Sequence, residues 1–134
     1  ARAVLMAQSG QYNYSRCLRR GEYGAAAMAL HEFVSAGLSM IFLLNRRYMP
    51  YYKWSFRAAR ELPVLREAAG ELERLAGGPV RTEERIEGVC RAVVQELKRQ
   101  GLTGGDWDYL EPHAMELTER IRDGELRNLH VMEG

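Results

Sequence analysis

Aromatic and cationic side chains are concentrated in one stretch of this chain, residues 45–57, which reads NRRYMPYYKWSFR. Guanidinium and ammonium groups bind phosphate or carboxylate oxygens, while Tyr and Trp rings stack on a base or a sugar. The stretch therefore predicts a binding site for an anionic or nucleotide-bearing molecule. Its candidate substrate-binding residues are Arg47, Tyr48, Lys53, Trp54 and Arg57.

Helical spacing separates two faces in this stretch if a helix begins at Pro50, a residue that suits a first helical position. One face carries three cations at i, i+4 and i+7, namely Lys53, Arg57 and Arg60. The other carries Tyr52, Phe56 and Ala59, and we expect it to point inward. The alternative interpretation is that the aromatic side chains belong to the core and the cations are solvated or paired with Glu61.

A second candidate set lies nearer the N-terminus, where a short segment containing arginine and glutamate precedes a helix that carries His31 and Glu32. Glu22 or Glu32 could act as a general base if a substrate reached it. Glu22 is added to the candidate substrate-binding residues. A histidine in an apolar helix is more typical of a core residue, so a free-standing enzyme would need a pocket that joins these groups to the cations.

Catalytic and metal-binding motifs are missing from the sequence. It contains no phosphate-binding glycine loop and no nucleophile elbow. His113 and Glu116 have a spacing compatible with metal ligation, but one such pair supplies too few ligands. Asp106 and Asp108 lack the preceding strand and Gly-Ser turn of a nucleotidyltransferase metal site. We therefore predict no catalytic residue, no metal site and no cofactor in this chain.

Length and charge restrict the function classes. The 134 residues suit one domain, and 19 basic and 18 acidic residues give a net charge of +1. A near-neutral chain is not a general coat for nucleic acid, so any anion site must be local. Cys17 and Cys90 stand far apart and belong to no C-x-x-C pair, which favours apolar helix residues in a reducing compartment.

Apolar residues recur at helical spacing throughout, so the sequence predicts an all-α fold. The first helix covers residues 2–20, with a break expected at Ser9-Gly10. The second covers residues 22–46 and is apolar around nearly its full circumference, which suits the centre of a bundle.

Proline and glycine residues divide the rest of the chain into shorter helices. The third helix runs from Pro50 to Pro63, and Pro63 can open the fourth, which ends at Gly77. The fifth ends at Gly101. A further helix begins near residue 107 and is followed by a short final segment. We expect a single-domain bundle of five to six helices over residues 1–134.

The apolar run at residues 33–44 is shorter than the ~20 residues that span a bilayer. No signal for secretion opens the chain. These features predict a cytoplasmic protein without membrane contact. The chain begins with Ala1 rather than Met, which fits Met removal or a C-terminal fragment of a longer protein.

Four motifs carry a family resemblance. They are QYNY at residues 11–14, RRGE at 19–22, FLLNRRYMPYYKW at 42–54 and RNLHVM at 127–132. They make the chain resemble, over nearly its whole length, domain of unknown function 4037, a helical domain that follows a nucleotidyltransferase-like domain. The arrangement is similar to that of kanamycin-type nucleotidyltransferases with their C-terminal helical bundles.

This resemblance implies that the catalytic half lies upstream and that this chain is the accessory or substrate-recognition bundle of a prokaryotic protein. Its partner would be an N-terminal nucleotidyltransferase-like domain, and nucleotide and Mg²⁺ would be used by the parent protein. The competing hypothesis is a purely structural or dimerisation domain in which the second helix packs across an interface between two copies.

Overall fold

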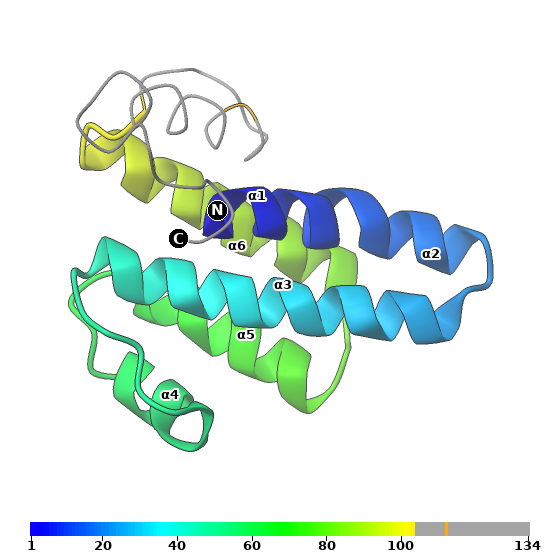
Figure 1. Cartoon of the computed structure of the whole chain (residues 1–134), viewed down its shortest axis with the longest axis horizontal. Coiled ribbons are helices and arrows are strands. Elements are labelled where there is room, and N and C mark those ends of the chain that lie inside the picture. Colours follow the sequence, from blue (N-terminus) through cyan, green and yellow to red (C-terminus); the bar gives the residue numbers. More distant parts are fainter. Residues whose placement is uncertain (104–111, 113–134) are drawn as a thin grey trace.

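The computed structural model describes residues 1–103 and residue 112, and the regular structure of these residues is helical throughout (Figure 1). A continuous N-terminal helix comprises α1 (Arg2–Met6), η1 (Ala7–Tyr14) and α2 (Ser15–Arg19). It is followed by α3 (Tyr23–Leu44), α4 (Tyr52–Ala59), α5 (Arg66–Gly77) and α6 (Thr82–Arg99). The predicted all-α class is confirmed. The helix expected near residue 107 and the final segment lie almost wholly outside the described residues.

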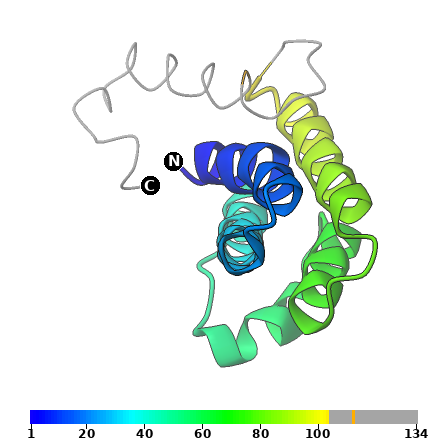
Figure 2. The same cartoon turned by 90° about the vertical axis from the view of Figure 1, so that its right-hand side faces the viewer.

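The long apolar helix α3 lies at the centre, as predicted. It contacts all three parts of the N-terminal helix and also packs against α5 and α6 (Figures 1 and 2). Phe33 and Ile41 of α3 are completely buried, together with Met6 of α1, Leu72 of α5 and Val93 of α6. These side chains form one core, which α3 contributes to along most of its length.

One side of α3 departs from the predicted all-round burial. Tyr23, Met28 and Leu43 are 71%, 75% and 55% exposed, and His31 and Glu32 are exposed as well. The expectation of a core histidine is therefore wrong for His31. The helix packs on three neighbours but leaves a mixed apolar and polar side open to solvent.

By length and apolarity alone, α3 could cross a membrane. However, 61% of its most apolar window is buried inside the protein, where it contacts the neighbouring helices. A core helix of a water-soluble bundle meets the same length and apolarity criterion.

The two cysteines are both free thiols, consistent with the predicted apolar roles. Cys90 is fully buried in α6, and this burial raises the pKa of its thiol, with a smaller contribution from the carboxylate of Glu87. The Cys90 thiol therefore stays protonated and packs as a small apolar side chain.

Two predicted helix starts are displaced. Helix α4 begins at Tyr52 rather than Pro50, because Tyr51 is extended (φ −51°, ψ 146°) and its carbonyl accepts the first helical hydrogen bond, from Trp54 N–H at 2.9 Å. Helix α5 begins at Arg66 rather than Pro63, because Leu65 adopts the left-handed conformation with φ 65°. Each proline precedes its helix by two or three residues.

The break expected at Ser9-Gly10 is instead a π-helical segment, η1, within a helix that continues without interruption. The Ser9 hydroxyl donates a hydrogen bond to the carbonyl of Leu5 at 2.5 Å. Gly10 faces the fully buried ring of Phe33, and a β-carbon at Gly10 would overlap that ring and touch Ile86. The absence of a side chain at Gly10 lets the N-terminal helix approach α3 and α6 closely.

We predict that Gly10→Ala destabilises the protein by about 1–3 kcal/mol, because the added methyl group must displace a ring that has no free volume around it. Gly88→Ala is the matched control, since a β-carbon at this exposed site in α6 would meet nothing within 4 Å. It should raise stability by up to about 1 kcal/mol through helix propensity. Urea unfolding measures both changes, and equal effects of the two substitutions would contradict the packing argument.

The C-terminal end of α6 is joined to the C-terminal end of α3 by a polar cluster. Gln100 Nε2 donates to the Leu44 carbonyl and to Glu96 Oε2, both at 2.9 Å. Arg99 Nε donates to both Glu96 oxygens, at 3.0 and 2.8 Å. The hydrogen bonds from Arg99 hold the pKa of Glu96 below its ordinary value of 4.5, and the bond from Gln100 acts in the same direction.

This cluster predicts an acid-sensitive contribution to stability. Because the pKa of Glu96 is lower in the folded state, its contribution is complete above about 4.5 and is lost as the pH falls through the folded pKa. Wild-type stability should therefore decline more steeply between pH about 5 and about 3 than that of Glu96→Gln. Urea midpoints across this range test the prediction, and parallel curves for the two proteins would contradict it.

Candidate functional site

Between α3 and α5 the chain leaves the bundle as an excursion, residues 46–63, which contains α4 and most of the predicted site. Figure 1 shows α4 set apart at the lower edge of the bundle, joined by a non-helical segment to the end of α3. Figure 2 shows the same separation from a second direction. The 46–63 excursion thus presents its residues on a projecting element.

Asn45 closes the base of this excursion. Its side-chain oxygen accepts a hydrogen bond from Val64 N–H, and its side-chain nitrogen donates to the Val64 carbonyl, both at 3.0 Å. The same nitrogen donates to the Ile41 carbonyl at 2.8 Å. One amide side chain therefore pairs both backbone polar groups of Val64 and ties the residue that follows the excursion to the end of α3.

The first residues of the excursion form a Schellman turn. Arg46 adopts the left-handed conformation with φ 56°. Its N–H donates to the Leu43 carbonyl at 2.9 Å, and the Arg47 N–H donates to the Phe42 carbonyl at 3.1 Å. Glycine is the usual residue at the left-handed position of this turn. Here the turn instead places two consecutive arginines, both exposed, at the exit of α3.

Helix α4 is anchored by one face only. Ser55 and Ala59 are buried, Phe56 is partly buried, and Leu62, just beyond the helix, is 1% exposed. This face packs against α5. The opposite face carries the exposed side chains of Lys53, Trp54 and Arg57, so the predicted outward orientation of the cations is confirmed.

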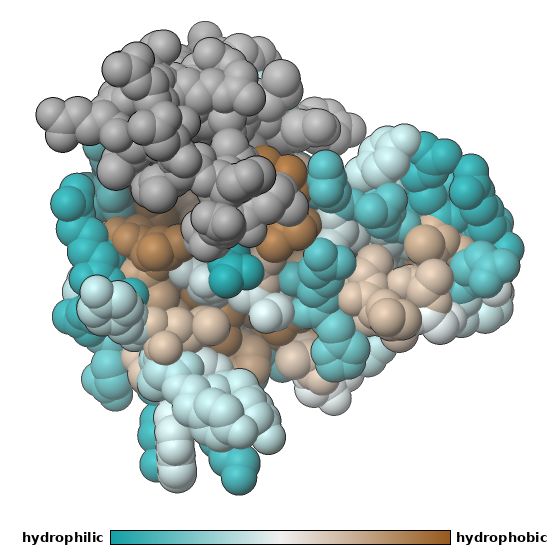
Figure 3. Space-filling model, in the orientation of Figure 1, coloured by the Kyte–Doolittle hydropathy of each residue, from teal (hydrophilic) through white to brown (hydrophobic). Residues whose placement is uncertain are grey.

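Four aromatic rings of the excursion are exposed to solvent. The exposed fractions are 101% for Tyr48, 64% for Tyr51, 68% for Tyr52 and 53% for Trp54. The interpretation of these aromatics as core is wrong, and so is the expected inward position of Tyr52. Figure 3 shows pale and teal residues gathered at the lower edge of the molecule, where α4 lies.

Contacts within the excursion hold some of these rings beside each other and beside a cation. The Arg57 guanidinium lies 5.4 Å from the centre of the Trp54 ring. The Tyr51 and Tyr52 rings are 4.6 Å apart and inclined at 57°. A guanidinium over an indole gains a cation–π attraction of about 0.5–1 kcal/mol at an exposed site. Trp54 and Arg57 therefore form one aromatic and cationic unit on the open face of α4.

Positive charge is concentrated in the part of the sequence that contains α4. No acidic residue occurs between Glu32 and Glu61, whereas this interval contains Arg46, Arg47, Lys53, Arg57 and Arg60. Its formal charge is +5, so the rest of the chain carries −4 to reach the total of +1. Within the described part of the chain, Arg60 pairs with Glu73 at 2.7 Å, and the other four cations have no acidic side chain within ion-pair distance.

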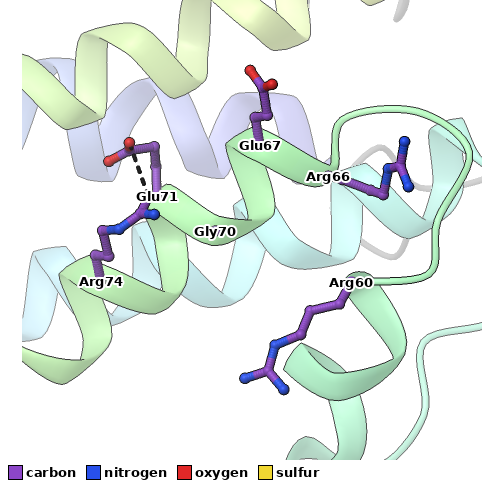
Figure 4. Close-up of a pocket in the computed structure, with 6 residues that line it drawn as sticks. All are labelled: Arg60, Arg66, Glu67, Gly70, Glu71 and Arg74. Carbon is purple, nitrogen blue, oxygen red and sulfur yellow. Dashed lines mark hydrogen bonds and ion pairs between the residues drawn. The ribbon is translucent and has the colours of Figure 1, made fainter.

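Two grooves adjoin the ends of the excursion. The larger, of about 420 Å³, is lined by Arg60 at the end of α4 and by five residues of α5 (Figure 4), which are Arg66, Glu67, Gly70, Glu71 and Arg74. Its lining carries three arginines and two glutamates, and Glu71 pairs with Arg74 at 3.1 Å within it. The second groove lies around Asn45, Arg46 and Gln100. Neither is lined by the exposed rings.

Glu22 lies far from the other predicted site residues. It is the exposed N-cap residue of α3, whereas the excursion leaves from the opposite end of that helix. The 22 residues of α3 separate the two ends by about 33 Å. His31 lines a separate small groove with Leu75 and Pro79. The structure brings together Arg47, Tyr48, Lys53, Trp54 and Arg57 on one excursion and leaves Glu22 outside it.

Metal-ligating side chains do not gather in the described part of the chain, where no group of three or more His, Cys, Asp or Glu residues could hold a metal ion. The His113 and Glu116 pair singled out by its spacing lies outside the described residues.

Asn45 is the important residue that sequence analysis missed. One signal was available in the sequence. Asn45 directly follows an apolar helix and precedes two arginines, and Asn is common where helices end. Its partner Val64 could not be identified from spacing, since the two residues are brought together only by the fold.

Comparison with known proteins gives one match. Residues 1–55 match the model of a family described as a domain of unknown function (DUF4037). The match includes three of the four motifs that carry the resemblance and extends into α4, so the resemblance is confirmed over this part of the chain. It is shorter than the nearly full-length resemblance expected. No curated protein and no solved structure matches the chain.

We predict that Asn45→Ala destabilises the protein by about 1–3 kcal/mol, because it leaves partly buried backbone groups of Val64 without partners. Amide hydrogen exchange at Val64 should accelerate more than exchange at Phe33 in the core. Gln95→Ala, at an exposed site on α6, is the control and should change neither quantity. Unchanged exchange at Val64 in Asn45→Ala would contradict the closing role of Asn45.

Proposed function

We propose that this chain, whose residues 1–55 match a family of unknown function, is the accessory, substrate-recognition bundle of a nucleotidyltransferase-like protein. It binds an anionic or nucleotide-bearing substrate through Arg47, Tyr48, Lys53, Trp54 and Arg57 and catalyses no reaction alone. The nucleotidyltransferase-like domain, the Mg²⁺ it would use, and a prokaryotic, cytoplasmic setting belong to the same proposal for the parent protein.

The observation that carries this proposal is the combination of exposed rings and unpaired cations on one element. Soluble proteins rarely leave several large aromatic side chains exposed together unless the surface binds something. The +5 charge of the acid-free interval favours an anionic ligand, and charge-assisted bonds to phosphate oxygens would satisfy Lys53 and Arg57. Glu22 is excluded from the proposed site because the length of α3 separates it from the excursion.

Mutation of the α4 cations tests the proposal. Lys53→Ala and Arg57→Ala should each weaken binding of ATP about tenfold or more, since a hydrogen bond to a charged group contributes about 1.5–3 kcal/mol. Arg91→Ala removes an exposed arginine of α6 and serves as the control. Titration calorimetry with ATP and with inorganic phosphate gives the affinities. The chain alone should not turn over ATP.

A second candidate function, a structural or dimerisation domain, draws support from the exposed side of α3, where Met28 and Leu43 are 75% and 55% exposed. Sedimentation equilibrium separates the two candidates. A dimer that Met28→Glu dissociates, together with equal ATP binding by wild type, Lys53→Ala and Arg57→Ala, would sink the substrate-recognition proposal and favour the structural one.

A further inference from the structure

The shape of the 46–63 excursion bears on which anionic ligand it takes. Sites for small molecules are concave and bury 70–90% of the ligand surface. Here the four rings project from an element that stands away from the bundle, with exposed fractions from 53% to 101%. The adjoining grooves are lined by Arg46 and Arg60 at the two ends of the excursion rather than by its rings. A mononucleotide would find one ring and little enclosure.

The spacing of the rings matches a longer ligand. Tyr48 and Tyr51 lie three residues apart in a non-helical segment, and three residues reach at most about 10 Å when fully extended. Trp54 follows on the first turn of α4. Successive nucleotides of a stacked strand are about 3.4 Å apart, so this reach corresponds to about three bases. Each ring offers a flat face that any base can stack on.

The cations are interleaved with the rings. Arg47 precedes Tyr48, Lys53 precedes Trp54, and Arg57 lies over the Trp54 ring. Alternating ring and cation is the arrangement that lets bases stack while the phosphates between them are neutralised.

We propose that the 46–63 excursion binds single-stranded nucleic acid of several nucleotides, with little sequence preference. This inference rests on the proposed function and names its substrate as a polynucleotide rather than a free nucleotide. A duplex hides the base faces that the exposed rings would stack on, so single strands are preferred.

Fluorescence anisotropy with a fluorescein-labelled 12-nucleotide thymidine strand tests the inference on the whole chain. Tyr51→Ala and Trp54→Ala should weaken binding about 5- to 100-fold, as expected when base stacking is lost, while Trp54→Phe retains most of the affinity. A plot of the logarithm of the binding constant against the logarithm of the salt concentration should have a slope of about −2, as expected for three phosphate contacts. Lys53→Ala and Arg57→Ala should each reduce this slope by about 0.7.

Matched competitors decide between ligand classes. Arg91→Ala should bind like wild type. Thymidine monophosphate and the matched duplex should compete at least tenfold more weakly than the unlabelled strand, and a poly-glutamate peptide of equal charge should compete as weakly. Circular dichroism spectra and urea midpoints establish that each variant is folded.

Four results would overturn the inference. Undiminished affinity in Tyr51→Ala and Trp54→Ala would show that charge alone binds the strand, and equal competition by poly-glutamate would point to an acidic protein partner. Equal competition by thymidine monophosphate, with loss of binding in Lys53→Ala, would reject the polynucleotide but leave the proposed nucleotide-bearing substrate standing. If neither strand nor mononucleotide binds, both proposals fail.

Discussion

The side-chain amide of Asn45 is the interaction on which the presentation of the excursion depends. Residues 46–63 contribute few side chains to the core, chiefly Ser55, Ala59 and Leu62. So little apolar burial offsets only part of the conformational entropy of ordering the segment. Two hydrogen bonds between the Asn45 side chain and the backbone of Val64 close the loop at its base, so that the limited packing of α4 against α5 acts within a closed loop.

The core is formed by helices other than α4, so the protein can leave aromatic rings of the excursion in solvent without losing its core. The N-terminal helix, α3, α5 and α6 bury Phe33, Ile41 and Leu72 among themselves. The rings of Tyr48 and Trp54 are therefore not needed for the stability of the bundle, and their exposure has to be explained by what the surface contacts. Polar cluster residues such as Gln100 hold the end of α3, from which the excursion leaves, against α6.

Periodicity predicted the elements well because the relevant physics is local. The apolar stripe of residues 22–46 predicted α3 to within two residues at each end, and the glycines near residues 77 and 101 marked helix ends correctly. Errors arose where tertiary contacts override local preference. Tyr52 was expected inward on helical spacing but is 68% exposed, whereas Ser55 and Ala59 are buried. The Asn45 and Val64 pairing joins residues 19 apart, and no local pattern contains it.

The net charge of the chain likewise gives only a limited prediction of function, because it does not show how the charges are distributed. A total of +1 argues against a protein that coats nucleic acid, yet it is the sum of a +5 interval and a −4 remainder. At physiological salt, charges on the surface act over a Debye length of about 8 Å. A ligand at α4 therefore senses Lys53 and Arg57 on that helix rather than a charge as distant as that of Glu22, at the other end of α3. The exclusion drawn from the total holds for the chain as a whole and does not extend to the excursion, where the local charge decides.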